Sequence, residues 1–99
     1  MMGAEKVEGV PVSFSGENLQ MGSTGEDVRV IQTQLNRIAD NFPSIPKVAV
    51  DGVYGNETRL AVEAFQRIFN LPADGIVGFS TWYKISHIYV SVTKMAALS

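Results

Sequence analysis

The stretch DGVYGNET, residues 51–58, decides the fold, because the chain repeats it as DGIVGFST at residues 74–81. Both copies read D-G-[VI]-x-G-x-x-T, and each position lies 23 residues after its counterpart. Two glycines at fixed places in both copies indicate that one backbone shape is needed twice in the fold. An internal repeat of this kind is evidence for a repeated structural unit.

Each copy has the composition of a tight turn followed by the start of a helix. Gly52 and Gly75 follow an aspartate and suit positions with positive φ, where the aspartate carboxylate can bond nearby backbone N–H groups in an Asx turn. Gly55 and Gly78 then stand where a helix begins, a place that tolerates glycine. Both copies are therefore expected to be loops that lead into helices.

Helical periodicity follows each loop and also precedes the first one. The first helix is predicted over 24–40, from apolar residues at spacings of three and four: Val28, Ile31, Leu35, Ile38 and Phe42. Ser23 and Glu26 have the spacing of a capping box at its start. Further helices are predicted over 57–69 and 80–90. The expected fold is an all-α, compact three-helix bundle with two repeated D-G-x-x-G-x-x-T loops.

The folded part is expected to occupy most of the chain. Residues 1–18 show no helical period and are interpreted as a linker or lead-in. Alternating apolar side chains there leave a short extended segment open as an alternative: Val10, Val12 and Phe14. Residues 19–92 form the predicted domain, and 93–99 a tail with a frayed helix end. Val50 and Val77 are expected to add a bridge or two of strand.

Composition restricts the classes of function. The 99 residues are 45% hydrophobic and 18% charged, which is typical of one small globular domain. A net charge of −2 and a pI near 5.2 argue against nucleic-acid binding, and no polybasic segment favours an anionic membrane. The absence of cysteine excludes disulfides and cysteine metal sites. No apolar run approaches the ~20 residues of a membrane span, and the chain starts without a signal-peptide pattern.

Catalytic and metal-binding patterns are weak. Asp51 and Asp74 could be read as a carboxylate pair for glycoside cleavage, but such catalysis needs two acids in different environments. Their equivalence in the repeat favours structural Asx roles instead. The loops lack the calcium pattern D-x-[DN]-x-[DN]-G-x5-E, and His87, the single histidine, has no partner at a zinc-ligand spacing. We therefore expect no catalytic residue, no metal and no cofactor.

A second repeat connects the helices to the loops. The pattern V-x-x-[IF]-Q places Gln32 and Gln66 beside apolar helix positions, 34 residues apart. Their amides are expected to satisfy backbone groups of the glycine loops, which are costly to bury without partners, with ligand contact as the alternative. Trp82 shares a helical stripe with Ile85 and Tyr89 and is expected in the core.

Taken in order, these motifs resemble the type 1 peptidoglycan-binding domain over about residues 19–90. They are L-Q-M-G-S-x-G-x-x-V-x-x-I-Q from residue 19, the two glycine loops, A-V-x-x-F-Q from residue 61, and T-W from residue 81. The resemblance implies a non-catalytic three-helix module, usually attached to cell-wall hydrolases, spore-coat proteins or phage lytic proteins, which it anchors to murein.

The chain departs from the family pattern at the start of two helices. The family commonly has proline after the second glycine of each loop, where this chain has Asn56 and Phe79. Asn56 is expected to cap its helix. Phe79 places an apolar ring at a helix start, as either a packing contact or part of the ligand surface.

Aromatic side chains near the loops are candidates for the ligand surface that the resemblance implies. Tyr54, Phe79 and Tyr83 are expected to be exposed, and an aromatic face with a polar tip suits stacking on a sugar ring. Packing in the small core is the alternative for all three residues.

Polar groups of the first loop are the other candidates. Asp51 and the outward N–H groups of Gly55 and Asn56 are assigned to the ligand surface, the N–H groups as a site for a stem-peptide carboxylate. Arg59 is a candidate for binding a carboxylate or lactyl group, with a solvated surface charge as the alternative.

The leading hypothesis is a non-catalytic module that binds peptidoglycan of the cell wall or spore cortex, through the glycan strand or the stem peptide. It would anchor a catalytic or structural domain of the same parent chain, in an extracellular or wall-associated protein of bacterial or phage origin. One alternative is a protein-interaction module, which predicts a contiguous apolar patch with Phe79, Ile88 and Val92. A stand-alone hydrolase, which murein zymography would reveal, is the third hypothesis.

Overall fold

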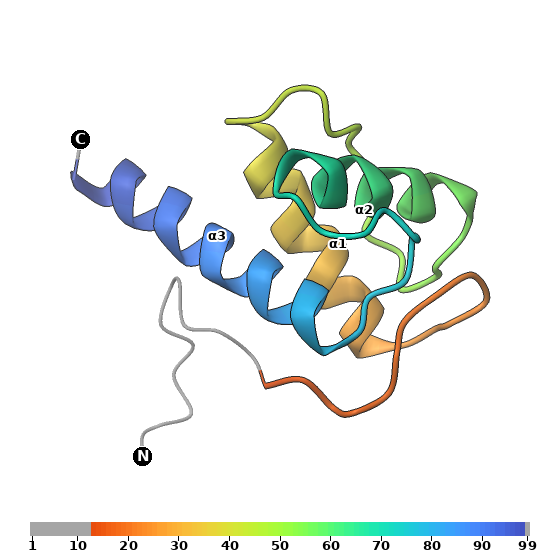
Figure 1. The fold of residues 1–99 in the computed structure, drawn as a ribbon. Coiled ribbons are helices and arrows are strands. Elements are labelled where there is room, and N and C mark those ends of the chain that lie inside the picture. The colour runs from red at the N-terminus through yellow and green to blue at the C-terminus, as the bar shows by residue number, and fades with distance from the viewer. Residues whose placement is uncertain (1–12, 99) are drawn as a thin grey trace, which may run out of the picture.

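Three helices, the two loops that connect them and the segment before α1 make up residues 13–98, the part of the chain that the computed structural model describes (Figure 1). The helices are α1 (Glu26–Ala39), α2 (Asn56–Ile68) and α3 (Phe79–Leu98). α1 packs against both α2 and α3, while the C-terminal half of α3 extends beyond the other two helices (Figure 1). The predicted three-helix architecture is confirmed. Within residues 13–98, no helix is long and apolar enough to cross a membrane.

The core lies where the apolar stripes of the three helices meet. α1 contributes the four predicted residues that are fully shielded from solvent: Val28, Ile31, Leu35 and Ile38. From α2, Ala61, Val62 and Phe65 are equally buried. Trp82 and Ile85 of α3 complete this core, so the expectation that Trp82 is buried is confirmed. In α1 and α3, spacings of three and four residues place these side chains on one face of the helix, which is why the periodicity located them.

The start of α1 differs from the prediction. The helix begins at Glu26, and Gly25 occupies the position before it with a φ of 120° and no side-chain capping bond. The Ser23 hydroxyl instead accepts a bond from the backbone N–H of Gln20, at 3.0 Å, and so closes a turn. The predicted capping box is therefore wrong, because Ser23 lies too far before the first helical residue to cap it.

α3 is longer than the sequence predicted. It continues to Leu98 instead of ending at about 90, so the predicted tail begins inside the helix. Val92 is buried, and the hydroxyls of Ser91 and Thr93 donate bonds to carbonyls one turn earlier. No glycine or proline follows Gly78 in the chain, so nothing in the sequence stops the helix.

Two isolated antiparallel bridges tie the segment before α1 to the two glycine loops. Leu19 pairs with Val77 and Thr24 pairs with Val53. Val77 therefore forms the bridge predicted for it. The bridge predicted at Val50 is wrong, because the residue that pairs with Thr24 is Val53, which lies after the turn of the first loop. The 19–24 segment thus holds both loops against the same side of the bundle.

The end of the lead-in segment packs on α3. The ring of Phe14 lies 5.7 Å from that of Trp82 and 6.4 Å from that of Phe79, measured between centroids. Its backbone N–H donates a bond to the Tyr83 hydroxyl at 3.2 Å. Val10 and Val12, the other residues of the expected extended segment, lie outside the described residues.

Candidate functional site

The two glycine loops have the same backbone shape. Gly52 and Gly75 have φ values of 75° and 71°, the left-handed region that glycine enters without strain. In each loop the preceding aspartate accepts a bond from the backbone N–H two residues later, at 3.0 Å in both. The Asx turns and positive φ values predicted from the repeated phrase are present.

Gln32 of α1 holds the first loop through both ends of its amide. Its Nε2 lies 3.1 Å from Asp51 Oδ1, 3.0 Å from the Val53 carbonyl and 3.1 Å from Thr58 Oγ1. Its Oε1 accepts bonds from the backbone N–H groups of Asp51 and Gly52, at 3.0 and 2.9 Å. The side chain is buried, so the loop depends on these bonds in place of water.

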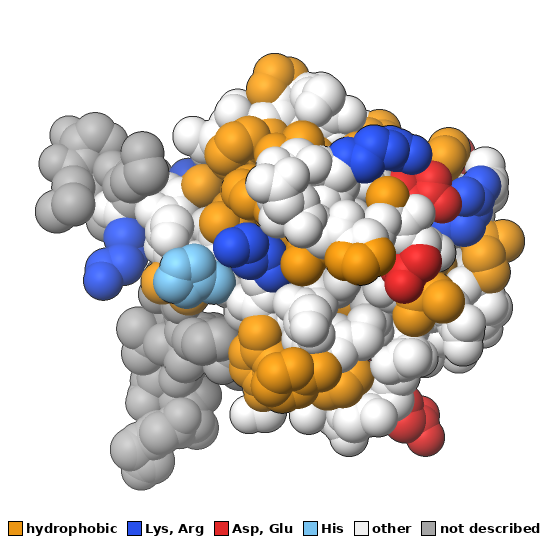
Figure 2. Space-filling model, in the orientation of Figure 1, with side chains coloured by type: hydrophobic (Ala, Val, Ile, Leu, Met, Phe, Trp, Pro, Cys, Tyr) orange, Lys and Arg blue, Asp and Glu red, His pale blue; other side chains and the backbone are white. Residues whose placement is uncertain are grey.

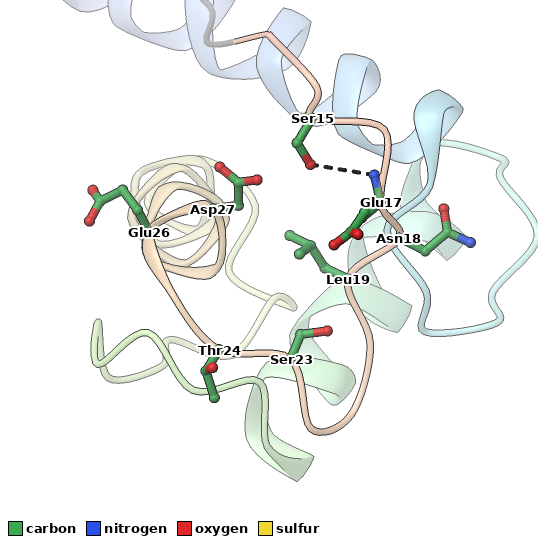
Figure 3. A pocket seen from close by; sticks show the side chains of 8 residues that line it. All are labelled: Ser15, Glu17, Asn18, Leu19, Ser23, Thr24, Glu26 and Asp27. Atoms are coloured by element: carbon green, nitrogen blue, oxygen red, sulfur yellow. Dashed lines mark hydrogen bonds between the residues drawn. The ribbon is translucent and has the colours of Figure 1, made fainter.

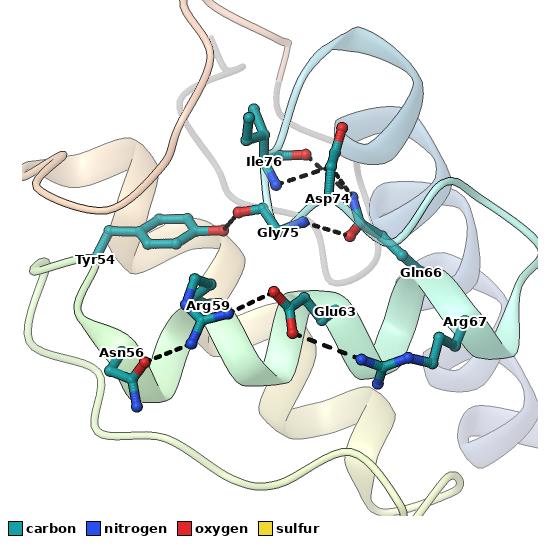
Figure 4. Close-up of polar contacts among 9 residues, drawn as sticks. All are labelled: Tyr54, Asn56, Arg59, Glu63, Gln66, Arg67, Asp74, Gly75 and Ile76. Atoms are coloured by element: carbon teal, nitrogen blue, oxygen red, sulfur yellow. Dashed lines mark hydrogen bonds and ion pairs between the residues drawn. The ribbon is translucent and has the colours of Figure 1, made fainter.

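Gln66 of α2 holds the second loop in the same way (Figure 4). Its Nε2 lies 3.0 Å from Asp74 Oδ1, 3.1 Å from the Ile76 carbonyl and 3.2 Å from Thr81 Oγ1. Its Oε1 accepts a bond from the N–H of Gly75 at 2.9 Å. The bracing bonds expected from the two glutamines are therefore present in both loops.

The threonine that ends each repeated phrase has a role that the sequence reasoning missed. Thr58 and Thr81 are both buried, and their hydroxyls meet the amides of Gln32 and Gln66. The signal was available, since threonine stands at the same place in both copies.

The loop aspartates belong to separate structural networks. Asp51 is bonded to Gln32 and Val53, and Asp74 to Gln66 and its own loop. The pKa of the Asp51 carboxyl is held below its usual value, first by the bond from the Val53 N–H and then by the Gln32 amide. A general acid in glycoside cleavage needs the opposite shift, so the arrangement favours the structural role.

The lowered pKa of Asp51 makes a prediction about acid stability. Since the folded-state pKa of Asp51 lies below the ordinary value of this carboxyl, 3.8, the unfolded chain binds more protons around that pH. The contribution of Asp51 is present above the unfolded pKa and is lost as the pH falls through the lower, folded-state pKa. Asp51→Asn, which keeps an acceptor oxygen, is expected to reduce the drop in the urea midpoint between about pH 5 and about pH 3. An unchanged acid-induced drop in this variant would contradict the assignment.

Tyr54 was expected on the ligand surface, and this prediction is wrong. Its side chain is 1% exposed, and its hydroxyl donates a bond to the Gly75 carbonyl at 2.6 Å (Figure 4). Burial raises the pKa of this hydroxyl well above its usual value. Tyr54 thus joins the first loop to the second. Its counterpart in the repeat is Val77, which is also fully buried.

Two further expectations about the start of α2 are also wrong. The N–H of Gly55 does not point outward but donates a bond to the Val53 carbonyl at 3.1 Å. The side chain of Asn56 does not cap the helix, since its Oδ1 accepts a bond from Arg59 Nη2 at 2.7 Å. Arg59 Nη1 bonds Glu63 Oε2 at 2.6 Å, and the charged row continues along α2 (Figure 4).

Three aromatic rings form what we call the aromatic ledge, made of Phe14, Phe79 and Tyr83. Phe79 is 66% exposed and Tyr83 38% exposed, and their ring centroids lie 4.8 Å apart. Figure 2 shows hydrophobic side chains gathered over the start of α3 and the end of the lead-in segment. The aromatic surface expected at Phe79 and Tyr83 is therefore accessible.

A shallow hollow accompanies each loop, and the two hollows are built alike. The first-loop hollow, of about 360 Å³, is lined by Val48, Ala49, Asp51, Val53, Gly55, Asn56, Glu57 and Thr58. The second-loop hollow, of about 350 Å³, is lined by Asn18, Leu71, Pro72, Asp74, Ile76, Gly78, Phe79, Ser80 and Thr81. Six positions of the repeated phrase line both hollows. The hollows differ at two equivalent positions. Asn56 and Glu57 are polar and line the first-loop hollow, whereas Phe79 and Ser80 line the second-loop hollow, so the ring of Phe79 joins that hollow to the aromatic ledge.

A third hollow of about 460 Å³ lies between the lead-in and the start of α1 (Figure 3). Glu17, Glu26 and Asp27 line it, so its charge repels anionic groups. Among residues 13–98, no cluster of histidine, aspartate and glutamate side chains could hold a metal ion.

The apolar patch predicted for a protein-interaction module is not contiguous. Phe79 is exposed, but Val92 is 5% exposed and Ile88 is half-buried against the core. The periodicity of α3 continues past residue 90 and turns Val92 inward, so the patch as predicted is wrong.

Comparisons with known proteins agree with this geometry. The model of the family described as "Putative peptidoglycan binding domain" matches residues 24–85. A "Probable N-acetylmuramoyl-L-alanine amidase" of Bacillus licheniformis is 45% identical over 69 residues, which cover 70% of this chain and 19% of that protein. A "Zinc D-Ala-D-Ala carboxypeptidase" of Streptomyces albus G is 42% identical over 73 residues, covering 74% and 27%. The crystal structure of the SleB N-terminal domain superimposes with a TM-score of 0.67 at 34% identity, covering 78% of this chain and 99% of that one.

Proposed function

The chain belongs to the peptidoglycan binding domain family, and on this premise we propose that it binds murein as a non-catalytic module and holds an attached domain at the bacterial wall. The observation that carries the proposal is the exposed aromatic ledge beside the second-loop hollow. The bracing glutamines and aspartates are bonded within the loops, so we assign the ligand to the ledge and the two loop hollows and not to these side chains.

We propose that the glycan strand stacks on Phe79 and Tyr83. A flat apolar ring suits the C–H face of a sugar, and the Tyr83 hydroxyl supplies a polar tip. The stem-peptide carboxylate is assigned to the first turn of α2 at Asn56, where backbone N–H groups have no partner inside the helix. Arg59 lies one turn along the same helix, although Glu63 already offsets its charge.

The parent protein is a further part of the proposal. The chain spans only 19% and 27% of the two curated relatives, which are named as an amidase and a carboxypeptidase. We propose that this module is likewise joined to a catalytic or structural domain that acts outside the cell or at the wall. Modest affinity would suffice, because tethering raises the local concentration of the attached domain at its substrate.

Co-sedimentation with purified murein sacculi tests the proposed surface. Phe79→Ala is expected to lower the affinity about tenfold, since it removes a stacking ring worth about 1 kcal/mol or more. Met21→Ala is the matched control, because Met21 is 53% exposed but lines none of the three hollows. Equal loss of binding in both variants would contradict the ledge assignment. A wild-type chain that dimerises and fails to sediment would favour the protein-interaction alternative.

A further inference from the structure

The hydroxyl of Tyr83 accepts a bond that limits how it can bind a ligand. The donor is the backbone N–H of Phe14, at 3.2 Å. A phenolic hydroxyl can accept one strong hydrogen bond and donate one of its own. Two hydrogens cannot occupy the same side of the oxygen, so the Tyr83 proton points away from the Phe14 backbone. Toward anything that binds beside it, the Tyr83 hydroxyl is therefore a donor.

The proton of this hydroxyl is open to solvent or to a ligand. Within residues 13–98, the contact with Phe14 is the one hydrogen bond that the Tyr83 hydroxyl makes. Tyr83 is 38% exposed, and the ring of Phe79, which is 66% exposed, lies 4.8 Å from it between centroids. The aromatic ledge thus offers an apolar ring and a hydrogen-bond donor side by side, and the acceptor of the same hydroxyl is already occupied.

We propose that the Tyr83 hydroxyl selects N-acetylated glycan, by donating its hydrogen bond to the carbonyl of an acetamido group while the sugar stacks on Phe79. This inference rests on the proposed binding of murein, whose sugars carry acetamido groups. An amide carbonyl accepts hydrogen bonds, whereas the ammonium group that remains when the acetyl group is removed can only donate them. The acetamido methyl group also suits the exposed apolar ring of Phe79.

Phe14 is the positioning residue of this arrangement. Its N–H occupies the acceptor of the Tyr83 hydroxyl, so an ammonium group has nothing to donate to there. Its ring lies 5.7 Å from that of Trp82 and 6.4 Å from that of Phe79, contacts that keep this backbone N–H against α3. A site that pairs with one polar group discriminates against an analogue that lacks it, because the partner is then left without its bond.

Co-sedimentation with two forms of purified sacculi tests the selection in the intact chain. One form is fully N-acetylated, and the other is extensively de-N-acetylated. Tyr83→Phe, which keeps the ring, is expected to lower the ratio of the affinities for the two forms about fivefold, the size expected from one hydrogen bond. Comparing this ratio between variants cancels the effect of the added amines on the charge of the sacculi, which acts on a chain of net charge −2.

The control variants isolate the hydroxyl and the N–H. Ser91→Ala removes a hydroxyl about two turns further along α3, which bonds the His87 carbonyl and lines none of the three hollows, and it is expected to leave the ratio unchanged. Phe14→Pro and Phe14→Ala both remove the ring, but proline also removes the N–H. Phe14→Pro is expected to give a ratio about twofold lower than Phe14→Ala, because the freed Tyr83 hydroxyl can then accept a bond from an amine.

The outcomes separate this inference from the proposed function. If the wild-type chain binds sacculi and Tyr83→Phe keeps the wild-type ratio, or weakens binding to both forms equally, the selection by the hydroxyl is overturned while murein binding stands. A ratio that falls as far in Ser91→Ala as in Tyr83→Phe overturns it as well. Equal ratios for the two Phe14 variants overturn the positioning role of Phe14. A wild-type chain that binds neither form overturns the proposed function, and this inference with it.

Discussion

Gln66→Leu is expected to lower the free energy of unfolding by about 3 kcal/mol or more, and to separate the second loop from α2. Leucine fills nearly the same space but cannot bond. The change would leave the Gly75 N–H, the Asp74 carboxylate and the Thr81 hydroxyl without the partner they have in the structure. An unsatisfied buried group costs about 1–3 kcal/mol, so the cost of losing several bonds in one buried network exceeds that of one typical hydrogen bond.

Urea denaturation of Gln66→Leu is compared with that of the same replacement at an exposed position. Gln20 is exposed in the 19–24 segment, and Gln20→Leu is expected to change stability by no more than about 0.5 kcal/mol. Gln32→Leu should match Gln66→Leu, because Gln32 makes the equivalent bonds to the first loop. Similar midpoints for the buried and exposed variants would show that the glutamines do not hold the loops.

Gly75→Ala is the second change with a large expected effect, about 2–4 kcal/mol of lost stability. The residue has a φ of 71°, where a side chain is strained, and an added Cβ would lie 2.9 Å from Arg59 Cγ and 3.1 Å from Glu63 Oε2. Its carbonyl also accepts the Tyr54 hydroxyl bond, so a shifted backbone would disturb the contact between the two loops.

Gly55→Ala in the first loop is the matched control for Gly75→Ala. Gly55 has a φ of −100°, and no atom lies within 4 Å of an added Cβ. Its replacement is expected to change stability by about 0.5 kcal/mol or less. Thermal melts of the two variants should therefore differ clearly, and comparable melting temperatures would mean that the second loop is not as tightly constrained as its contacts indicate.

The loop framework was predictable because the sequence states it twice. Repeated glycines marked the positive φ values at Gly52 and Gly75, and repeated glutamines marked the braces from α1 and α2. The burial of Tyr54 was missed because a tyrosine side chain, with an apolar ring and a polar hydroxyl, suits either the core or the surface. Its position is decided by the packing of the first loop on the second, which the sequence of one loop does not show. Its repeat counterpart, Val77, carried the correct signal.

Local signals at helix ends failed where long-range pairing overrides them. Ser23 and Glu26 match a capping box, but the Gly25 N–H bonds the Gly52 carbonyl at 2.9 Å, and this pairing sets where α1 begins. The length of α3 was underestimated because its apolar residues lie on more than one side, which obscures a single stripe. Neither the start of α1 nor the length of α3 is determined by the residues of a single helical turn.

The repeated framework carries two different surfaces. Both hollows use the same six loop positions, but Asn56 and Glu57 face the first where Phe79 and Ser80 face the second. Bonds inside the loops fix the backbone, so the side chains at these variable positions distinguish one surface from the other. This arrangement suits a ligand with both an apolar sugar face and polar groups, as murein has.

Chemical-shift mapping with soluble muropeptide fragments tests most directly whether the glycine loops are scaffold for a murein-binding surface. The expected result is saturable shifts at the backbone amides of Asn56, Phe79 and Tyr83, with the side-chain amide signals of Gln32 and Gln66 unchanged. Saturable shifts confined to residues away from both loops, or none at concentrations where intact sacculi bind the chain, would contradict it.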